Sequence, residues 1–344
     1  MKNEASAAET ATGLAGTAAD AGGASSTRQP RSPLVLTGAF APGEEAIWLD
    51  ALRRAMPEER ILRLQEVAAP DEVEVAIVAN PDPAVVRRFP ALRWVQSLWA
   101  GVEKLVAEPA FASLPVVRMI DPQLARTMAE AVLAWTLYLH RDMPAYLAQQ
   151  RARQWRQLPY VAPADRRVGL LGLGTLGEAA AHVLRQAGFS VQGWSRTLKR
   201  FDPQAGVATF SGSDGLDEMV SRTDILVCLL PLTRQTRHLV DGTLLRRLPA
   251  GASVVNFGRG PLIRTSDLLA ALDAGRLAHA VLDVFDEEPL PQASPLWLHP
   301  RVTVLPHISA DTDPATASLI VAGNVARWRH SGAIPPAVDR ARGY

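Results

Sequence analysis

The stretch Val168-Gly169-Leu170-Leu171-Gly172-Leu173-Gly174-Thr175-Leu176-Gly177 decides the fold of this chain. A short apolar run leads directly into the pattern G-x-G-x-x-G, and a helical pattern then continues to residue 187. In a strand–turn–helix of this kind, the first glycine permits the tight turn, the second lets a pyrophosphate approach, and the third lets helix pack on strand. The stretch therefore predicts a dinucleotide-binding turn whose cofactor contacts are Gly172, Gly174, Thr175, Leu176 and Gly177.

The sequence on either side repeats the same alternation of strand and helix. After the quoted stretch, the apolar runs predict a sheet of six strands at 167–173, 190–194, 225–230, 253–257, 279–284 and 302–305. Before it, runs at 34–38, 61–64, 73–78, 92–98 and 116–120 predict another sheet. A last helix near 315–330 would return to this first unit. The fold class is thus α/β, with two Rossmann-like doubly wound parallel-sheet domains, the N-terminal one discontinuous and completed by the C-terminal helix.

The predicted domains follow from these units. Residues 33–123 and 307–344 form a substrate domain, and residues 124–306 form an NAD(P)-binding domain. The latter begins with an arm of two helices at 124–138 and 145–155, the first apolar almost all round, which indicates burial between elements or subunits. Residues 1–32 consist mainly of Ala, Gly, Thr and Ser and cannot bury enough apolar surface to fold, so we expect a disordered tail. The tail resembles neither a secretory signal nor a transit peptide.

Composition narrows the possible partners. Of the 344 residues, 48% are hydrophobic and 21% charged, and a formal net charge of +1 gives no electrostatic reason to bind nucleic acid or an anionic membrane. No apolar stretch reaches the about 18 residues of a membrane span. The one cysteine, Cys228, lies in an apolar run, which indicates a buried thiol and no disulfide framework or metal cluster. We expect a cytoplasmic protein without a metal, a nucleic-acid partner or a membrane partner.

The segment after the strand at 190–194 indicates which nicotinamide cofactor is preferred. Sites for NAD place an acidic residue there, about 20 residues beyond the glycines, to bind the ribose 2′-hydroxyl. This chain instead carries Ser195, Arg196 and Lys199, and no carboxylate occurs before Asp202. A hydroxyl and cations suit the 2′-phosphate of NADPH. The pattern predicts that NADPH is preferred and NADH possible, with an ordinary basic surface turn as the alternative.

Three further residues predict a catalytic set. Arg259, Glu288 and His307 each follow a predicted parallel strand, and ligands of open α/β sheets bind beyond the carboxyl ends of the strands. An arginine can hold a carboxylate, and a histidine can exchange a proton near neutral pH. A glutamate beside that histidine favours its protonated form. Taken singly, the three have plainer interpretations as a surface arginine, an acidic turn and a loop histidine.

Over residues 34 to 344 the sequence resembles the D-isomer-specific 2-hydroxyacid dehydrogenase family. Segment 230–236 is similar to that family's loop beside the cofactor, and segments 256–260 and 282–290 match its Arg and Glu signatures. The resemblance implies the catalytic set Arg259, Glu288 and His307. It also implies substrate contacts at Trp99, Ala100, Gly101, Arg259 and His307, and further cofactor contacts at Leu230, Pro231, Thr236, Phe257, Gly258 and Asp283. A homodimer built by the arm is implied too, with Trp155 reaching the partner's site.

The implied activity is NADPH-preferring reduction of a small 2-keto acid, glyoxylate or hydroxypyruvate, to glycolate or D-glycerate. His307 would donate the proton, Glu288 would hold it charged, and Arg259 would anchor the carboxylate and the carbonyl. Two alternatives stay open. One is a dehydrogenase for a larger 2-keto acid of the phenylpyruvate or branched-chain type, because pocket volume depends on side-chain geometry. The other is a nicotinamide-sensing binding protein without turnover.

Overall fold

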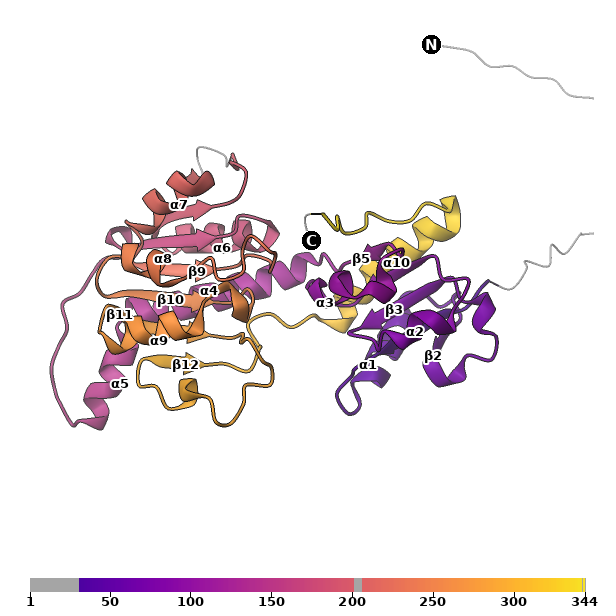
Figure 1. Cartoon of the computed structure of the whole chain (residues 1–344), viewed down its shortest axis with the longest axis horizontal. Helices are drawn as coiled ribbons and strands as arrows, with labels where there is room; N and C mark the ends of the chain where they lie inside the picture. The colour runs from indigo at the N-terminus through magenta and orange to yellow at the C-terminus, as the bar shows by residue number, and fades with distance from the viewer. Residues whose placement is uncertain (1–30, 201–205, 342, 344) are drawn as a thin grey trace, which may run out of the picture. The chain divides into compact units, whose positions relative to one another are not determined.

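The computed structural model describes residues 31–200, 206–341 and 343 (Figure 1). The predicted disordered tail, residues 1–32, lies outside the described residues except for its last two. Of these, Ser32 belongs to the folded part. Its hydroxyl donates to Glu74 Oε2 at 2.8 Å, and the Arg329 guanidinium binds its oxygen atoms.

A five-stranded parallel sheet contains the N-terminal strands, in the order β2-β1-β3-β4-β5. The strands are β1 (Leu34–Gly38), β2 (Ile61–Arg63), β3 (Val75–Ala79), β4 (Trp94–Ser97) and β5 (Val116–Val117). The helices of this unit are α1 (Glu44–Ala55), α2 (Ala84–Arg88), α3 (Glu103–Ala107) and the C-terminal α10 (Pro314–Ser331). Helix α10 packs on α1, where Val321 and Trp328 share one buried cluster with Trp48 and Leu52. The last helix therefore completes the N-terminal unit, as the sequence predicts.

The second sheet has seven parallel strands in the order β12-β11-β10-β9-β6-β7-β8. They are β6 (Arg167–Leu171), β7 (Ser190–Trp194), β8 (Val207–Phe210), β9 (Ile225–Cys228), β10 (Ala252–Asn256), β11 (Leu277–Leu282) and β12 (Val302–Val304). Strands β7 and β8 are added on one side of β6, and β9 to β12 are added on the other side. This reversal of strand order between β6 and β9 makes the sheet doubly wound and confirms the predicted fold class. The prediction of six strands was wrong by one. Among the described residues, edge strand β8 pairs only with β7, and it lacks a continuous apolar run, so its sequence gives no clear signal.

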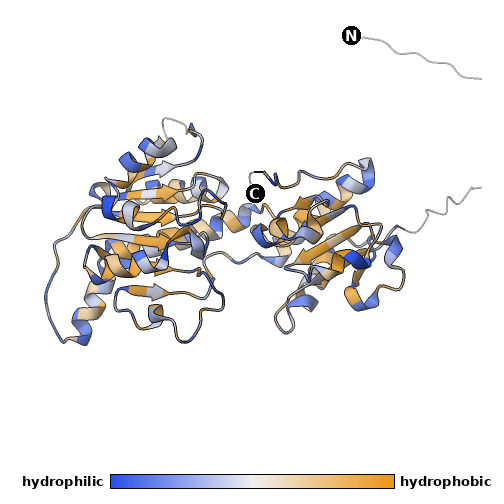
Figure 2. Ribbon diagram, in the orientation of Figure 1, coloured by the Kyte–Doolittle hydropathy of each residue, from blue (hydrophilic) through white to orange (hydrophobic). Residues whose placement is uncertain are grey.

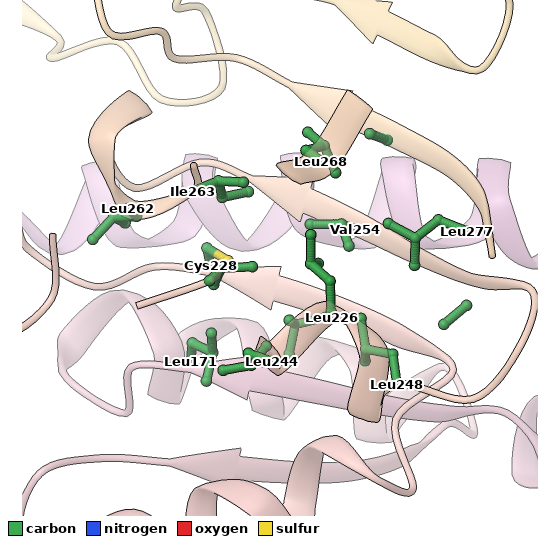
Figure 3. Close-up of a cluster of buried hydrophobic side chains, with 14 of the residues drawn as sticks. Leu171, Leu226, Cys228, Leu244, Leu248, Val254, Leu262, Ile263, Leu268 and Leu277 are labelled. Atoms are coloured by element: carbon green, nitrogen blue, oxygen red, sulfur yellow. The ribbon is translucent and has the colours of Figure 1, made fainter. Parts of the chain in front are cut away.

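Helices cover both faces of the seven-stranded sheet. They are α4 (Pro122–His140), α6 (Thr175–Gln186), α7 (Gly212–Val220), α8 (Gly242–Arg247) and α9 (Thr265–Asp273), whereas α5 (Met143–Arg151) contacts α4. One buried cluster joins strands β6, β9 and β10 to α8 and α9 (Figure 3). Within it Cys228 has no exposed surface, and burial raises the pKa of its thiol to about 12. The interpretation of Cys228 as a core residue is confirmed.

The arm agrees with its prediction in the first helix, whose burial between elements was one of two alternatives, and differs from it in the second. Much of the apolar surface of α4 is buried within the chain, where Met128 and Val132 share a cluster with Leu184 of α6. Helix α5 ends at Arg151 rather than at residue 155, and Arg153 has a positive φ of 53°. The polar run at 151–154 offers no apolar face that could pack and continue the helix. As a result Trp155 lies in an irregular segment with its side chain fully exposed.

Hydropathy follows the architecture. Figure 2 shows hydrophobic residues concentrated on the strands of both sheets and on the helix faces that cover them.

Among the described residues, no helix is long and apolar enough to cross a membrane. The predicted domain limits at 123/124 and 306/307 stay a prediction.

Candidate active site

The glycine-rich turn joins β6 to α6 at the point where the sheet reverses. Gly172 has a φ of 110°, a conformation that side-chain-bearing residues rarely adopt. A Cβ at Gly177 would lie 1.9 Å from the carbonyl oxygen of Gly172, so only glycine lets the helix start this close to the turn. Among the described residues no side chain caps the first turn of α6, and a Cβ at Gly174 would meet none of their atoms within 4 Å. Free N–H groups at a helix N-terminus with open space before them fit a pyrophosphate.

The basic segment after β7 lines the same cleft. The Ser195 hydroxyl donates to the Thr197 carbonyl oxygen at 2.8 Å, and Lys199 Nζ lies 3.2 Å from Glu178 Oε1 on α6. The side chains of Lys199 and Glu178 are 45% and 49% exposed, so this ion pair contributes little and can open at low cost. The segment can therefore offer Ser195, Arg196 and Lys199 to a phosphate group.

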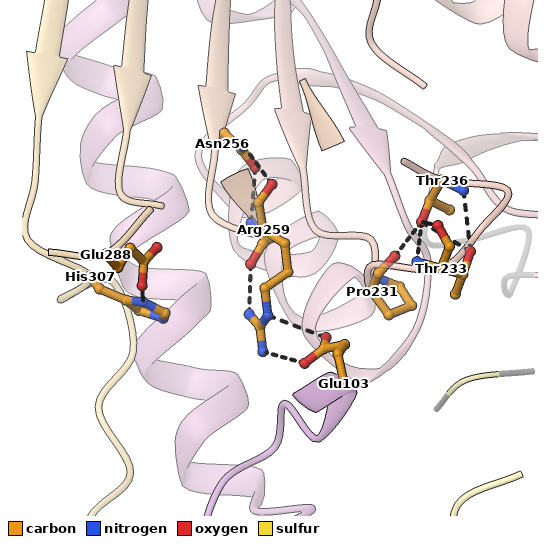
Figure 4. A network of polar contacts seen from close by, with 9 residues as sticks. Glu103, Pro231, Thr233, Thr236, Asn256, Arg259, Glu288 and His307 are labelled. Carbon is orange, nitrogen blue, oxygen red and sulfur yellow. Dashed lines mark hydrogen bonds and ion pairs between the residues drawn. The ribbon is translucent and has the colours of Figure 1, made fainter. Parts of the chain in front are cut away.

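The loop after β9 is held by its own threonines (Figure 4). The Thr236 hydroxyl donates to the Pro231 carbonyl oxygen at 2.7 Å and accepts from the Thr233 N–H at 2.7 Å. Leu230 and Pro231 line the cleft next to Gly258, where a Cβ would lie 2.8 Å from the Leu230 carbonyl oxygen. Thr236 thus shapes this loop, and its contact with a cofactor stays a prediction.

Arg259 follows β10 in a turn that Asn256 fixes. The Asn256 amide donates to the Arg259 carbonyl oxygen at 2.9 Å and accepts from the Gly258 N–H at 3.2 Å. The guanidinium Nη1 donates to the Gly258 carbonyl oxygen at 2.7 Å. Its Nε and Nη2 reach Glu103 of α3 at 3.2 and 3.4 Å (Figure 4). Sequence reasoning missed Glu103, because nothing local marks an ion pair between residues 156 positions apart.

His307 and Glu288 form the other charged pair of the site. His307 Nδ1 lies 2.8 Å from Glu288 Oε2, and Glu288 Oε1 accepts the Phe285 N–H at 2.9 Å (Figure 4). The hydrogen bond with Glu288 raises the pKa of His307 above its ordinary value, although burial and the nearby Arg259 oppose this. Burial alone would raise the pKa of Glu288, but the hydrogen bonds from His307 and Phe285 outweigh it and lower that pKa. The pair can hold a protonated imidazole whose Nε2 remains to act on a ligand.

Asp283 fixes the segment that carries His307. This carboxylate is 2% exposed and accepts the N–H groups of Ile308 and Ser309 at 2.8 and 2.9 Å. Trp99 is likewise fixed, because its N–H donates to the Ser97 hydroxyl at 3.0 Å and its ring packs edge-on against Trp48 with centroids 5.7 Å apart. Trp99 therefore belongs both to the core and to the wall of the cleft.

Every site residue that the sequence predicts lines one cleft of about 940 Å³, and Trp155 is not among its lining residues. The residues that the sequence predicts for substrate binding and catalysis are Trp99, Ala100, Gly101, Arg259, Glu288 and His307, and these roles stay predictions. The predicted cofactor contacts that line the cleft are Gly172, Gly174, Thr175, Leu176, Gly177, Ser195, Arg196, Lys199, Leu230, Pro231, Thr236, Phe257, Gly258 and Asp283. Figure 4 shows the Arg259 and His307 side chains, which come from different strand ends.

A doubly wound sheet with a glycine-rich phosphate turn, and an arginine and a His–Glu pair on the same cleft, defines a nicotinamide-dependent oxidoreductase. Comparison with known proteins narrows the class. Residues 133–309 match the model of the D-isomer specific 2-hydroxyacid dehydrogenase, NAD binding domain. The chain belongs to this family, which confirms the resemblance found in the sequence.

Relatives that match most of the chain belong to the same class of enzyme. Glyoxylate/hydroxypyruvate reductase A of Salmonella paratyphi B is 38% identical over 305 residues, which are 87% of this chain and 96% of that protein. A D-isomer specific 2-hydroxyacid dehydrogenase of Xanthobacter autotrophicus Py2, crystallised with NADPH and MES, has a TM-score of 0.85 and 38% identity over 91% of this chain and all of its own. An NADPH-dependent glyoxylate/hydroxypyruvate reductase of Sinorhizobium meliloti, in complex with NADP and sulfate, has a TM-score of 0.83 and 35% identity over the same shares.

Proposed function

We propose that this protein is an NADPH-preferring reductase that converts glyoxylate or hydroxypyruvate to glycolate or D-glycerate. The observation that carries the proposal is that the His307–Glu288 pair and Arg259 line the same cleft as the glycine-rich turn and the basic segment after β7. The relatives whose names include glyoxylate/hydroxypyruvate reductase support the substrate. The relatives crystallised with NADPH or NADP support the cofactor.

The roles of the residues follow from their contacts. NADPH, when bound, supplies the hydride that reduces the ketone carbon. His307 donates a proton from Nε2 to the carbonyl oxygen, because its Nδ1 is bonded to Glu288. Glu288 favours the protonated imidazole, since their hydrogen bond raises the pKa of His307 above its ordinary value. Arg259 and the loop at 99–101 bind the substrate carboxylate, and Arg259 also polarises the carbonyl.

The cofactor preference rests on the residues after β7. No acidic residue stands where an NAD site holds the ribose 2′-hydroxyl, and Ser195, Arg196 and Lys199 line the cleft instead. Lys199 would exchange its exposed partner Glu178 for the 2′-phosphate. A guanidinium at Arg196 suits a phosphate because it can donate two parallel hydrogen bonds.

A substrate panel with both cofactors tests the proposal. Loss of NADPH absorbance is followed with glyoxylate, hydroxypyruvate, phenylpyruvate and 2-ketoisocaproate, and then repeated with NADH. We expect glyoxylate or hydroxypyruvate to give the highest kcat/KM, with NADPH favoured by at least about tenfold. A clear preference for the larger acids would replace this proposal with the larger-substrate alternative. Binding of NADPH without turnover of any acid would favour a nicotinamide-sensing protein.

We also propose a homodimer built by α4, α5 and the segment after them. Several large apolar side chains remain exposed there, including Met143 at 38%, Leu147 at 43% and the fully exposed Trp155. Apolar surface of this kind is usually covered by a partner. Light scattering at micromolar concentration should give the mass of two chains, and a monomer mass would contradict the proposal.

A further inference from the structure

Glu103 is an acidic residue inside a site that the proposed function requires to bind an anion. It is the first residue of α3, two positions after Gly101. Its carboxylate pairs with two nitrogens of Arg259, Oε1 to Nε at 3.2 Å and Oε2 to Nη2 at 3.4 Å (Figure 4). The side chains of Glu103 and Arg259 are 23% and 32% exposed, so water screens this pair less than it screens a surface pair.

The hydrogen bonds of the guanidinium leave part of it available. A guanidinium has five N–H donors in a fixed plane, one on Nε and two on each terminal nitrogen. Glu103 takes the Nε–H and one N–H of Nη2, and the Gly258 carbonyl oxygen takes one N–H of Nη1. Within the part of the chain that the structure describes, one N–H on each terminal nitrogen remains for a substrate oxygen. Glu103 therefore fixes the plane of the guanidinium without using all of its donors.

Gly101 shows where this orientation places the guanidinium. A Cβ at Gly101 would lie 1.6 Å from Arg259 Nη2, so the nitrogen occupies space that only glycine leaves open. Gly101 belongs to the loop at 99–101 that the proposed function assigns to the substrate carboxylate. The contact with Glu103 thus holds Nη2 directly against that loop.

We infer that Glu103 is a positioning residue, which holds the Arg259 guanidinium against the loop at 99–101 so that its remaining N–H groups meet the keto acid. The inference rests on the proposed function, because it assigns the substrate to Arg259. An arginine has a long side chain with many rotamers, and a two-point contact with a carboxylate selects one of them. Glu103 acts through Arg259 and does not itself touch the substrate.

The sign of the effect on ligand binding separates positioning by Glu103 from simple electrostatic repulsion or competition by Glu103. A negative charge beside an anion site weakens anion binding, so Coulomb's law alone predicts that removing it tightens a carboxylate ligand. The same sign would be seen if Glu103 merely competed with the substrate for Arg259. Positioning predicts the opposite, because a guanidinium released from Glu103 leaves the geometry that binds the ligand.

The test compares E103Q with wild type and with the matched control E72Q. Glutamine keeps the shape of Glu103, but its amide nitrogen cannot accept a hydrogen bond from Arg259. Glu72 is an exposed glutamate of the same unit and is not among the residues that line the cleft. We expect E103Q to lower kcat on glyoxylate about tenfold, equivalent to about 1.4 kcal/mol. The variant should also weaken the binding of oxamate, used as the carboxylate ligand, to the NADPH-loaded protein. E72Q should match wild type in both.

A double-mutant cycle with R259A shows whether Glu103 acts through Arg259. In the R259A background E103Q should cause no further loss, whereas an independent effect on folding or the loop would add. Tighter oxamate binding, a lower KM, an unchanged kcat or additive losses would each overturn the inference. If E103Q does not fold, E103D, which keeps the charge but shortens the reach, takes its place with the same expected sign. If wild type reduces no keto acid, the proposed function fails, and oxamate binding still tests Glu103.

Discussion

Replacing His307 by asparagine tests the proton donor with little disturbance of the fold. His307 has a φ of 57°, a left-handed conformation that asparagine tolerates better than alanine does. An asparagine amide can still donate to Glu288 but has no proton to release. The segment itself should stay in place, because Asp283 binds the N–H groups of Ile308 and Ser309 rather than the His307 side chain.

The size of the effect follows from the hydrogen bonding of the ring. Since Nδ1 is bonded to Glu288, Nε2 is the nitrogen that can protonate a substrate, and the substitution removes it entirely. A positioned general acid contributes roughly 10²–10⁴-fold, so kcat for glyoxylate reduction by NADPH should fall by that factor. The KM should change little, because Arg259 and the loop at 99–101 remain. Stopped-flow and steady-state absorbance measure kcat, and thermal unfolding checks the fold. A kcat near that of wild type would show that His307 is not the donor.

Three further variants test other parts of the site. In E288Q the pKa of His307 should fall, because the hydrogen bond with Glu288 raises it in wild type. Reduction needs the protonated ring, so the upper limb of the profile of kcat/KM against pH should move to lower pH. An unmoved limb would contradict the pairing of Glu288 with His307. Changing Arg196 and Lys199 together to alanine should lower kcat/KM with NADPH at least about tenfold while leaving NADH nearly unaffected, as kinetics with both cofactors would show. In G177A the new Cβ meets the preceding turn, so urea unfolding should show a loss of about 1–3 kcal/mol.

Two controls match these substitutions. Arg222 pairs with Glu218 on α7 and is not among the cleft residues, so R222A should leave the ratio of NADPH to NADH activity unchanged. Gly323 lies exposed in α10, where a Cβ would meet no atom within 4 Å. G323A should therefore stabilise the protein by about 0.5–1 kcal/mol, the opposite sign to G177A. Equal effects of the two glycine substitutions would show that close packing at Gly177 is not the cause.

The features that local sequence determines were predictable. The glycine-rich turn and the apolar runs of buried parallel strands are short-range signals, and they identified the doubly wound sheet. The rule that ligands bind beyond strand ends then predicted from the sequence that Arg259, Glu288 and His307 share one site. The structure brings those three residues to one cleft, and their catalytic roles stay predictions.

Features that depend on side-chain reach or on weak local signals were not predictable. Strand β8 is a short, half-exposed edge strand, and neither its length nor its composition distinguishes it from a loop. Helix α5 ends within the polar run at 151–154, whose intrinsic propensity suits a helix, so only the lack of an apolar face that could pack ends it there. The pairing of Glu103 with Arg259 requires two distant segments to meet, and no periodicity reports that.

A recurring arrangement explains how irregular loops hold the residues of this site in place. Each loop is hydrogen-bonded to a polar side chain at or just after the end of a strand. These residues are almost fully buried, with exposed fractions of 0% for Ser97, 1% for Asn256 and 2% for Asp283. Each accepts backbone N–H groups of the loop that it supports, which satisfies its own buried oxygen and orders the loop at the same time. A buried acceptor left without those N–H groups would be costly, so the loop conformation and the burial stabilise each other. The order of the two sheets thereby continues two to five residues beyond the strand ends, as far as the side chains that face the cleft.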